Sequence, residues 1–171
     1  METSLAADDT TKIDTIKHLE GKYLSFIVNN EDYCLEVLKV REIIGIMKIT
    51  PVPQSPNYVK GVINLRGKVI PVIDLRTKFG MTEAEHTKET CIIVVDVAHS
   101  LRGIIVDTVS EVLVVTHEQL EKSPKFGNNV ENDIFLGLAK IKHRVKMILD
   151  IDKILDSADI HKLNDLPEVA A

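Results

Sequence analysis

The chain has 171 residues, a formal net charge of −5 at pH 7, 44% hydrophobic residues and 27% charged residues. This length excludes a large multidomain enzyme, and the composition is that of a globular protein rather than a disordered or fibrous one. Tryptophan is absent and aromatic residues make up only 4%, so the core depends on Val, Ile and Leu, which favour strands.

The sequence also predicts a cytoplasmic protein without direct membrane insertion. Its longest uninterrupted apolar run, residues 91–95, is far shorter than the roughly 20 residues that a transmembrane helix needs. Residues 1–11 carry acidic side chains and lack the basic and apolar regions of a secretory signal. Cys34 and Cys91 lie in apolar, strand-like runs, which is typical of buried thiols in a reducing compartment.

The first predicted elements are two strands and a short helix. Successive side chains of residues 22–29 fall on alternate faces, and a polar turn follows, which predicts a strand. A second strand is predicted over residues 33–37. Apolar residues at positions 40, 43 and 44 have the spacing of one helix face. We therefore expect a short helix over residues 38–44.

A loop stiffened by prolines leads from this segment into a hairpin. The hairpin strands are expected over residues 58–64 and 69–74, with Arg66 at the tip. Gly67 can supply the positive φ that such a turn needs. Asp74 can then cap a helix of one to two turns, which Gly80 would end.

The second half repeats this pattern of short strands. A polar connector covers residues 81–89, and Thr116 begins a sequence with capping-box spacing. The polar segment 122–133 is expected to be a long exposed loop. Further strands or apolar runs are predicted over residues 91–97, 101–106, 112–115, 134–141 and 145–151, with a last short helix over 152–155.

The two halves of the chain match each other. The pattern of Val-x-Glu and two aliphatic residues occurs at positions 40–44 and recurs at positions 109–113. Further along the chain, the separation between matching residues of the two halves is again constant but longer by one loop insertion. It aligns Gly61 with Gly137 and Asp74 with Asp150. Chance matches among valines and isoleucines are the alternative, but the matching Glu, Gly and Asp positions favour an internal duplication.

The duplication predicts a mainly β fold with two small five-stranded barrels and short helices. The halves are residues 22–80 and 91–155, and each is small enough to close into a barrel. Because each half alone buries little apolar surface, the barrels should share a central core, with a groove between them. Residues 1–21 and 156–171 are expected to be an acidic N-terminal tail and a C-terminal tail.

The sequence carries no recognisable catalytic motif. None of its six histidines has a second His or Cys at metal-ligand spacing, and the glycine-rich phosphate loops and the nucleophile elbow are absent. We expect no enzymatic activity, no cofactor and no metal. A double barrel that binds a small ligand or nucleic acid remains the alternative, although aromatic residues do not accompany the basic clusters.

One long segment resembles a known family. Residues 59–79, VKGVINLRGKVIPVIDLRTKF, are similar to the signature of CheW-type chemotaxis coupling proteins. The resemblance covers residues 22–155 and includes the sequences YCLEVLKVREI and GIIVDTVSEV. Cys34 departs mildly from it, because the family often has Gly or Ala there.

The resemblance implies two SH3-like barrels and a non-enzymatic adaptor that links chemoreceptors to the histidine kinase CheA at receptor arrays on the inner face of the membrane. It implies that a receptor's helical tip binds between the barrels, at positions corresponding to Val40, Glu42, Arg66 and Val112. Local structure is the other interpretation of these four residues. The resemblance also implies contact with the regulatory domain of CheA, but it assigns no kinase-binding residues.

Overall fold

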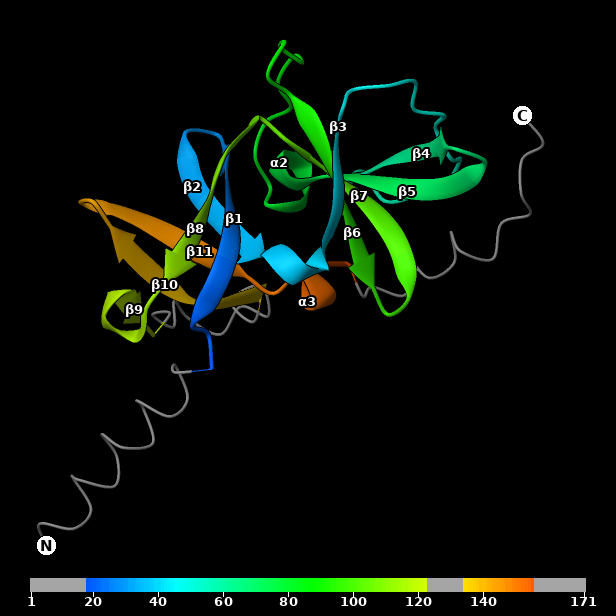
Figure 1. Ribbon diagram of the computed structural model, residues 1–171. Coiled ribbons are helices and arrows are strands. Elements are labelled where there is room, and N and C mark those ends of the chain that lie inside the picture. The colour runs from blue at the N-terminus through cyan, green and yellow to red at the C-terminus, as the bar shows by residue number, and fades with distance from the viewer. Residues whose placement is uncertain (1–17, 123–133, 156–171) are drawn as a thin grey trace, which may run out of the picture.

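The computed structural model describes residues 18–122 and 134–155 and has a mainly β fold, as the sequence predicts (Figure 1). Short helices interrupt the strands. The elements, in chain order, are β1 (Gly21–Val28), β2 (Glu31–Glu36), the 3-10 helix η1 (Val37–Lys39), β3 (Val40–Gly45), β4 (Val59–Leu65), β5 (Lys68–Asp74), α2 (Leu75–Lys78), β6 (Cys91–Val97), β7 (Ser100–Val106), β8 (Thr108–Val115), the 3-10 helix η2 (His117–Gln119), β9 (Leu120–Glu121), β10 (Phe135–Ile141), β11 (Arg144–Leu149) and α3 (Ile151–Leu155).

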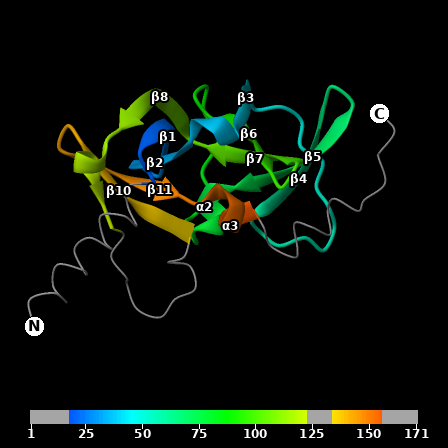
Figure 2. The same cartoon turned by 60° about the horizontal axis from the view of Figure 1, so that its bottom comes forward.

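The strands form two sheets, which Figure 2 shows as the two sides of the molecule. The six-stranded sheet has the order β8-β1-β2-β11-β10-β9, and the five-stranded sheet has the order β3-β6-β7-β5-β4. In the internal repeat, β1 to β5 correspond in order to β6, β7, β8, β10 and β11. When every strand is exchanged for its counterpart, the order β8-β1-β2-β11-β10 of the first sheet becomes β3-β6-β7-β5-β4, which is the order of the second sheet. The sheets therefore have the same strand topology.

Each sheet nevertheless contains strands from both halves of the chain. The expectation that each half closes into its own barrel is wrong, because parallel pairing joins β2 to β11 and β5 to β7. The chain crosses from one sheet to the other at η1, between β2 and β3, and at Asp107, between β7 and β8. Nearest-neighbour hairpins are visible in a sequence, whereas pairing between distant strands is not.

The predicted helix over residues 38–44 is also wrong. Only η1 is helical, and β3 begins at Val40. Along β3 the half-buried and exposed residues alternate, which is the period of a strand with one covered face. The spacing of Val40, Ile43 and Ile44 fits a helix face by coincidence, since pairing with β6 decides the backbone conformation.

Other local predictions are confirmed. The carboxylate of Asp74 accepts a hydrogen bond from the backbone N–H of Arg76 at 2.9 Å, and Gly80 follows α2 with a φ of +75°. The side chain of Gln119 accepts a hydrogen bond from the backbone of Thr116. The predicted loop 122–133 lies almost entirely outside the described residues. Among the described residues, no helix is long and apolar enough to cross a membrane.

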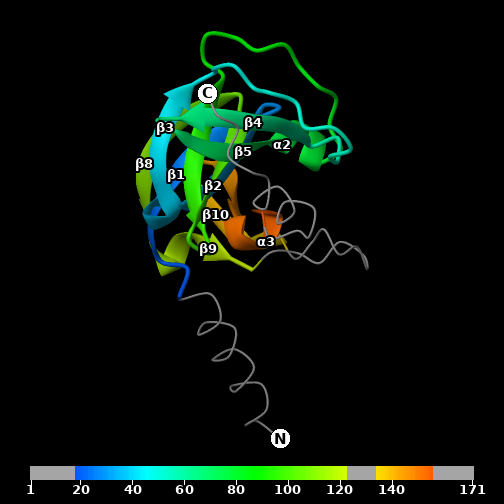
Figure 3. The ribbon, with the colours of Figure 1, turned by 90° about the vertical axis from the view of Figure 1, so that its right-hand side faces the viewer.

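A shared hydrophobic core joins the two sheets, as the sequence predicts. It combines Phe26 and Leu35 of one sheet with Ile93 and Ile104 of the other, all fully buried, and α3 contributes Ile154. A smaller cluster lies within each sheet. Figure 3 looks along the molecule from the end that carries β4 and β5. The common core fixes how the sheets face each other.

Candidate functional site

Within residues 18–122 and 134–155, the strand β3 is an edge strand, paired with β6 on one side only. Its exposed positions are Arg41, Ile43 and Gly45, and its half-buried positions include Val40 and Glu42. Val40 packs against the shared core. A register shift lies between Val40 and Glu42, so the strand bends where its candidate binding residues begin.

The turn between β4 and β5 holds Arg66 at its tip, as predicted. Arg66 and Gly67 both have a positive φ, +51° and +85°, which matches the twist of a two-residue hairpin turn. The side-chain oxygen of Asn64 accepts a hydrogen bond from the backbone N–H of Gly67 at 2.9 Å. The Arg66 side chain is 71% exposed. The turn therefore presents the guanidinium to the surface.

Glu42 and Arg66 form a bidentate ion pair. Nη1 of Arg66 donates to Oε1 of Glu42 at 3.0 Å, and Nη2 donates to Oε2. The hydrogen bond from Arg66 lowers the pKa of Glu42, and the bond to Glu42 raises the pKa of Arg66. Two of the four residues implied by the resemblance thus act as one unit.

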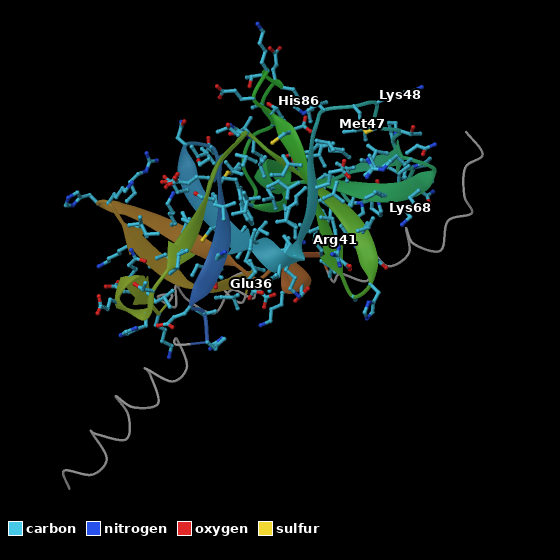
Figure 4. All side chains as sticks on the ribbon, in the orientation of Figure 1. Glu36, Arg41, Met47, Lys48, Lys68 and His86 are labelled. Carbon is cyan, nitrogen blue, oxygen red and sulfur yellow. The ribbon has the colours of Figure 1, made fainter. Side chains whose placement is uncertain are left out.

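A second ion pair lies beside the first. Nη2 of Arg41 donates to Oδ2 of Asp96 on β6 at 2.7 Å. Both pairs line a surface hollow of about 370 Å³, together with Lys68 and others. Figure 4 labels Arg41 and Lys68 on this part of the molecule. The hollow has a charged wall whose cationic groups outnumber the two carboxylates.

Val112 lies on β8, the edge strand of the other sheet, and is 56% exposed. Its backbone partner is Leu24 of β1. The structure thus places Val112 in a different sheet from Val40, Glu42 and Arg66. Figures 1, 2 and 3 agree that β3 and β8 lie on the same side of the molecule. The groove expected between the barrels stays a prediction.

The internal repeat identifies a residue that the resemblance left out. Val40 corresponds to Val109 in the repeat, and both are half-buried against the shared core. Val112 corresponds to Ile43, and both are exposed large aliphatic residues. Ile43 is 45% exposed on β3. The match between positions 40–44 and 109–113 could therefore have found Ile43 as the surface counterpart of Val112.

Further exposed aliphatic residues extend this side. Val114 follows Val112 by two positions on β8, so both side chains lie on the same face of the strand. Leu38, in η1, is 87% exposed. Exposed aliphatic residues are ordinary when they are single, but several on neighbouring edge elements are typical of an interaction surface.

Burial affects both thiols of the described part of the chain. Burial raises the pKa of the Cys34 thiol to about 12 and also raises the pKa of Cys91. A thiol with a raised pKa is a poor nucleophile. Residues 18–122 and 134–155 contain no cluster of three or more His, Cys, Asp or Glu side chains that could hold a metal ion.

Comparison with known proteins identifies the family. Residues 22–159 match the model of the CheW-like domain. The chain is 36% identical over 151 residues to the chemotaxis protein CheW of Klebsiella aerogenes, covering 85% of this chain and 91% of that protein. It is 37% identical over 136 residues to CheW of Bacillus subtilis, covering 79% and 86%.

A solved structure agrees with this match. The scaffolding protein TtCheW from Thermoanaerobacter tengcongensis superposes with a TM-score of 0.75 at 31% sequence identity, over 82% of this chain and 95% of that one. Family model, relatives and fold thus agree. The chain belongs to the CheW-like family, and it is a chemotaxis scaffold rather than an enzyme.

Proposed function

We propose that this protein couples chemoreceptors to the histidine kinase CheA, as an adaptor in the cytoplasm at receptor arrays on the inner face of the membrane. The observation that carries this proposal is the placement of two exposed edge strands, β3 and β8, on one side of a CheW-like fold. They carry exposed aliphatic residues, and Glu42 of β3 forms an ion pair with Arg66 of the turn between β4 and β5.

The receptor contact is a helical hairpin tip that binds in the inter-barrel groove, at Val40, Glu42, Arg66 and Val112. A helix in a groove needs apolar contacts and a few charged groups that set its orientation. Val112 and Ile43 supply exposed apolar surface. A guanidinium carries five N–H donors, and only two are needed for Glu42, so Arg66 can still donate to a helix-end carbonyl or a carboxylate.

The kinase contact uses other surfaces. The regulatory domain of CheA is the proposed partner, and it would meet an end of one barrel in a pseudo-symmetric pairing. The two sheets have matching strand topologies, so each offers a similar end to such a partner. We assign no individual residues to this contact.

The proposal is tested by binding and by recovery from cells. A purified cytoplasmic fragment of a chemoreceptor is titrated calorimetrically into the wild-type protein and into Val112→Glu. The matched control is Val145→Glu, because Val145 is also an exposed valine, 48% exposed, but lies on β11. Affinity should fall for Val112→Glu and stay unchanged for Val145→Glu.

A pull-down from a lysate of a chemotactic bacterium should recover receptors and a CheA-type kinase together. The alternative function, a double barrel that binds a small ligand or nucleic acid, makes a different prediction. It requires salt-sensitive binding of oligonucleotides or of a small molecule, without enrichment of receptors. Failure to bind the receptor fragment, together with such binding, would replace the adaptor by the alternative.

A further inference from the structure

The two points where the chain crosses between the sheets are each held by an ion pair. At the first crossing, Nζ of Lys39 in η1 donates to both carboxylate oxygens of Asp152 in α3, at 3.3 and 3.0 Å. At the second, Nε and Nη2 of Arg76 in α2 donate to Oδ1 and Oδ2 of Asp107, at 2.9 and 2.6 Å. We call these two ion pairs the crossover latches.

The crossover latches occupy corresponding places in the internal repeat, matching residue for residue on the helix side and one residue apart at the crossing segment. The alignment that places Asp74 on Asp150 also places Arg76 on Asp152. The alignment that places Val40 on Val109 relates Asp107 to Leu38, the neighbour of Lys39. In each half, the helix that follows the last strand is therefore bonded to a crossing segment. The charges are inverted: the helix supplies the cation in one latch and the anion in the other.

Each latch lies directly before an edge strand that carries candidate binding residues. Lys39 is followed by Val40, the first residue of β3. Asp107 is followed by Thr108, the first residue of β8, which contains Val112. Among the strands that the structure describes, each edge strand has a partner on one side only, so the position of its first residues depends on the crossing segment.

The Asp107 latch also connects the two sheets. Besides Arg76, its carboxylate accepts a hydrogen bond from the backbone N–H of Asn29 at 2.8 Å. Asn29 lies in the turn between β1 and β2 of the six-stranded sheet, whereas α2 follows β5 of the five-stranded sheet. The Arg76 side chain is only 19% exposed, so water competes little for these bonds.

We infer that the two crossover latches fix the relative placement of β3 and β8, and that Lys39, Asp152, Arg76 and Asp107 are positioning residues for receptor binding. This inference rests on the proposed adaptor function. The latch residues act through the edge strands: a broken latch lets the start of its edge strand shift, and the apolar residues of β3 and β8 then no longer meet one ligand together.

The charge inversion makes the inference testable by exchanging partners. Lys39→Asp and Asp152→Lys each place like charges together, and the double variant restores an ion pair with opposite polarity. Both partners are partly exposed, so the single variants should remain folded. The control is the exposed pair of Lys140 and Glu121, which joins β10 to β9 away from both crossings.

Two measurements separate positioning from binding itself. Calorimetric titration with a purified receptor cytoplasmic fragment gives the affinity, and amide hydrogen exchange gives the protection of Val40–Gly45. We expect each single variant to bind about three- to tenfold more weakly and to lose protection in β3, with both restored in the double variant. Lys140→Asp should leave both measurements unchanged.

Two results would overturn the inference. If the wild type binds the fragment but the single variants bind as tightly as it does, or if the exchanged pair restores neither affinity nor protection, the Lys39–Asp152 latch does not position the site and the inference fails. If the wild type does not bind the fragment, the adaptor proposal fails. Amide exchange in β3 then still tests whether the latch positions this strand, because unchanged exchange in the single variants would contradict that role.

Discussion

Glu42 and Arg66 lie 24 positions apart in the sequence, and the structure joins them in a bidentate ion pair between an edge strand and a hairpin tip. Neither residue is free to act alone, because a partner that engages Arg66 also affects the carboxylate of Glu42. The family resemblance implies both residues as receptor-binding positions, and the ion pair gives a physical reason why the two positions belong to one site.

We expect Arg66→Ala to weaken receptor binding by about 5- to 150-fold, the equivalent of lost hydrogen bonds to a charged group. Stability should hardly change, since exposed ion pairs contribute little. Calorimetric titration with a receptor-tip fragment and a urea unfolding curve check both points. Lys142→Ala, in the corresponding turn between β10 and β11, is the control, because this residue also has a positive φ but does not line the hollow. Unchanged affinity for Arg66→Ala would leave Arg66 a residue of the hairpin alone.

Val112→Glu should fold normally and lose receptor binding. The side chain of Val112 is more than half exposed, so a carboxylate there stays hydrated and the free energy of unfolding should change by no more than about 0.5 kcal/mol. The loss of apolar contact and the added charge would act only in the complex. A thermal unfolding curve beside the binding titration measures both, and a collapsed variant would contradict the exposed placement.

Val40→Glu should behave differently. Val40 packs against the shared core, so the variant carboxylate would lose hydration. We expect the free energy of unfolding to fall by about 1–3 kcal/mol, the cost of burying a polar group without a partner. Urea unfolding measures this loss. Receptor binding should weaken as well, because Val40 belongs to the proposed contact; a fully stable Val40→Glu protein would contradict the packing of Val40 against the core.

Asp107 should stabilise the protein in a pH-dependent way. Burial by itself would raise the pKa of Asp107, but hydrogen bonds from Arg76 and from the backbone of Asn29 lower it below its ordinary value. A carboxyl whose folded-state pKa is lowered stabilises the protein above its unfolded-state pKa, about 3.9, and this stabilisation is lost as pH falls through the folded-state pKa.

We therefore expect Asp107→Asn to lose about 1–3 kcal/mol of stability at pH 7. The difference from wild type should shrink as the pH is lowered below about 4, because the wild-type carboxyl then also becomes neutral. Urea unfolding curves of both proteins across this range provide the measurement. A difference that stays constant with pH would show that the charge of Asp107 is not responsible.

Gly61→Ala should be strongly destabilising. Gly61 has a φ of +142°, and a Cβ atom there would overlap the backbone carbonyl of Thr50, which pairs with Val62. We expect a loss of at least about 2 kcal/mol in urea unfolding. Gly45→Ala is the matched control, because no atom lies within 4 Å of its added Cβ. A stable Gly61→Ala protein would refute the close approach of the two backbones.

Much of the local structure could be predicted from the sequence. The hairpin of β4 and β5, the cap that Asp74 provides for α2 and the strand β6 depend on patterns and turn residues that lie close together in the chain. The internal repeat also predicted the shared core, since neither half alone has enough apolar surface to bury.

Tertiary structure alone decided the remaining features. The segment that begins with Val40 is a strand because β6 pairs with it, against the helical spacing of its apolar residues. The exchange of strands between the halves, the Glu42–Arg66 ion pair and the crossover latches join residues at least 24 positions apart. A linear pattern records local preferences of the backbone, whereas these contacts depend on which distant strands pair to bury the common core.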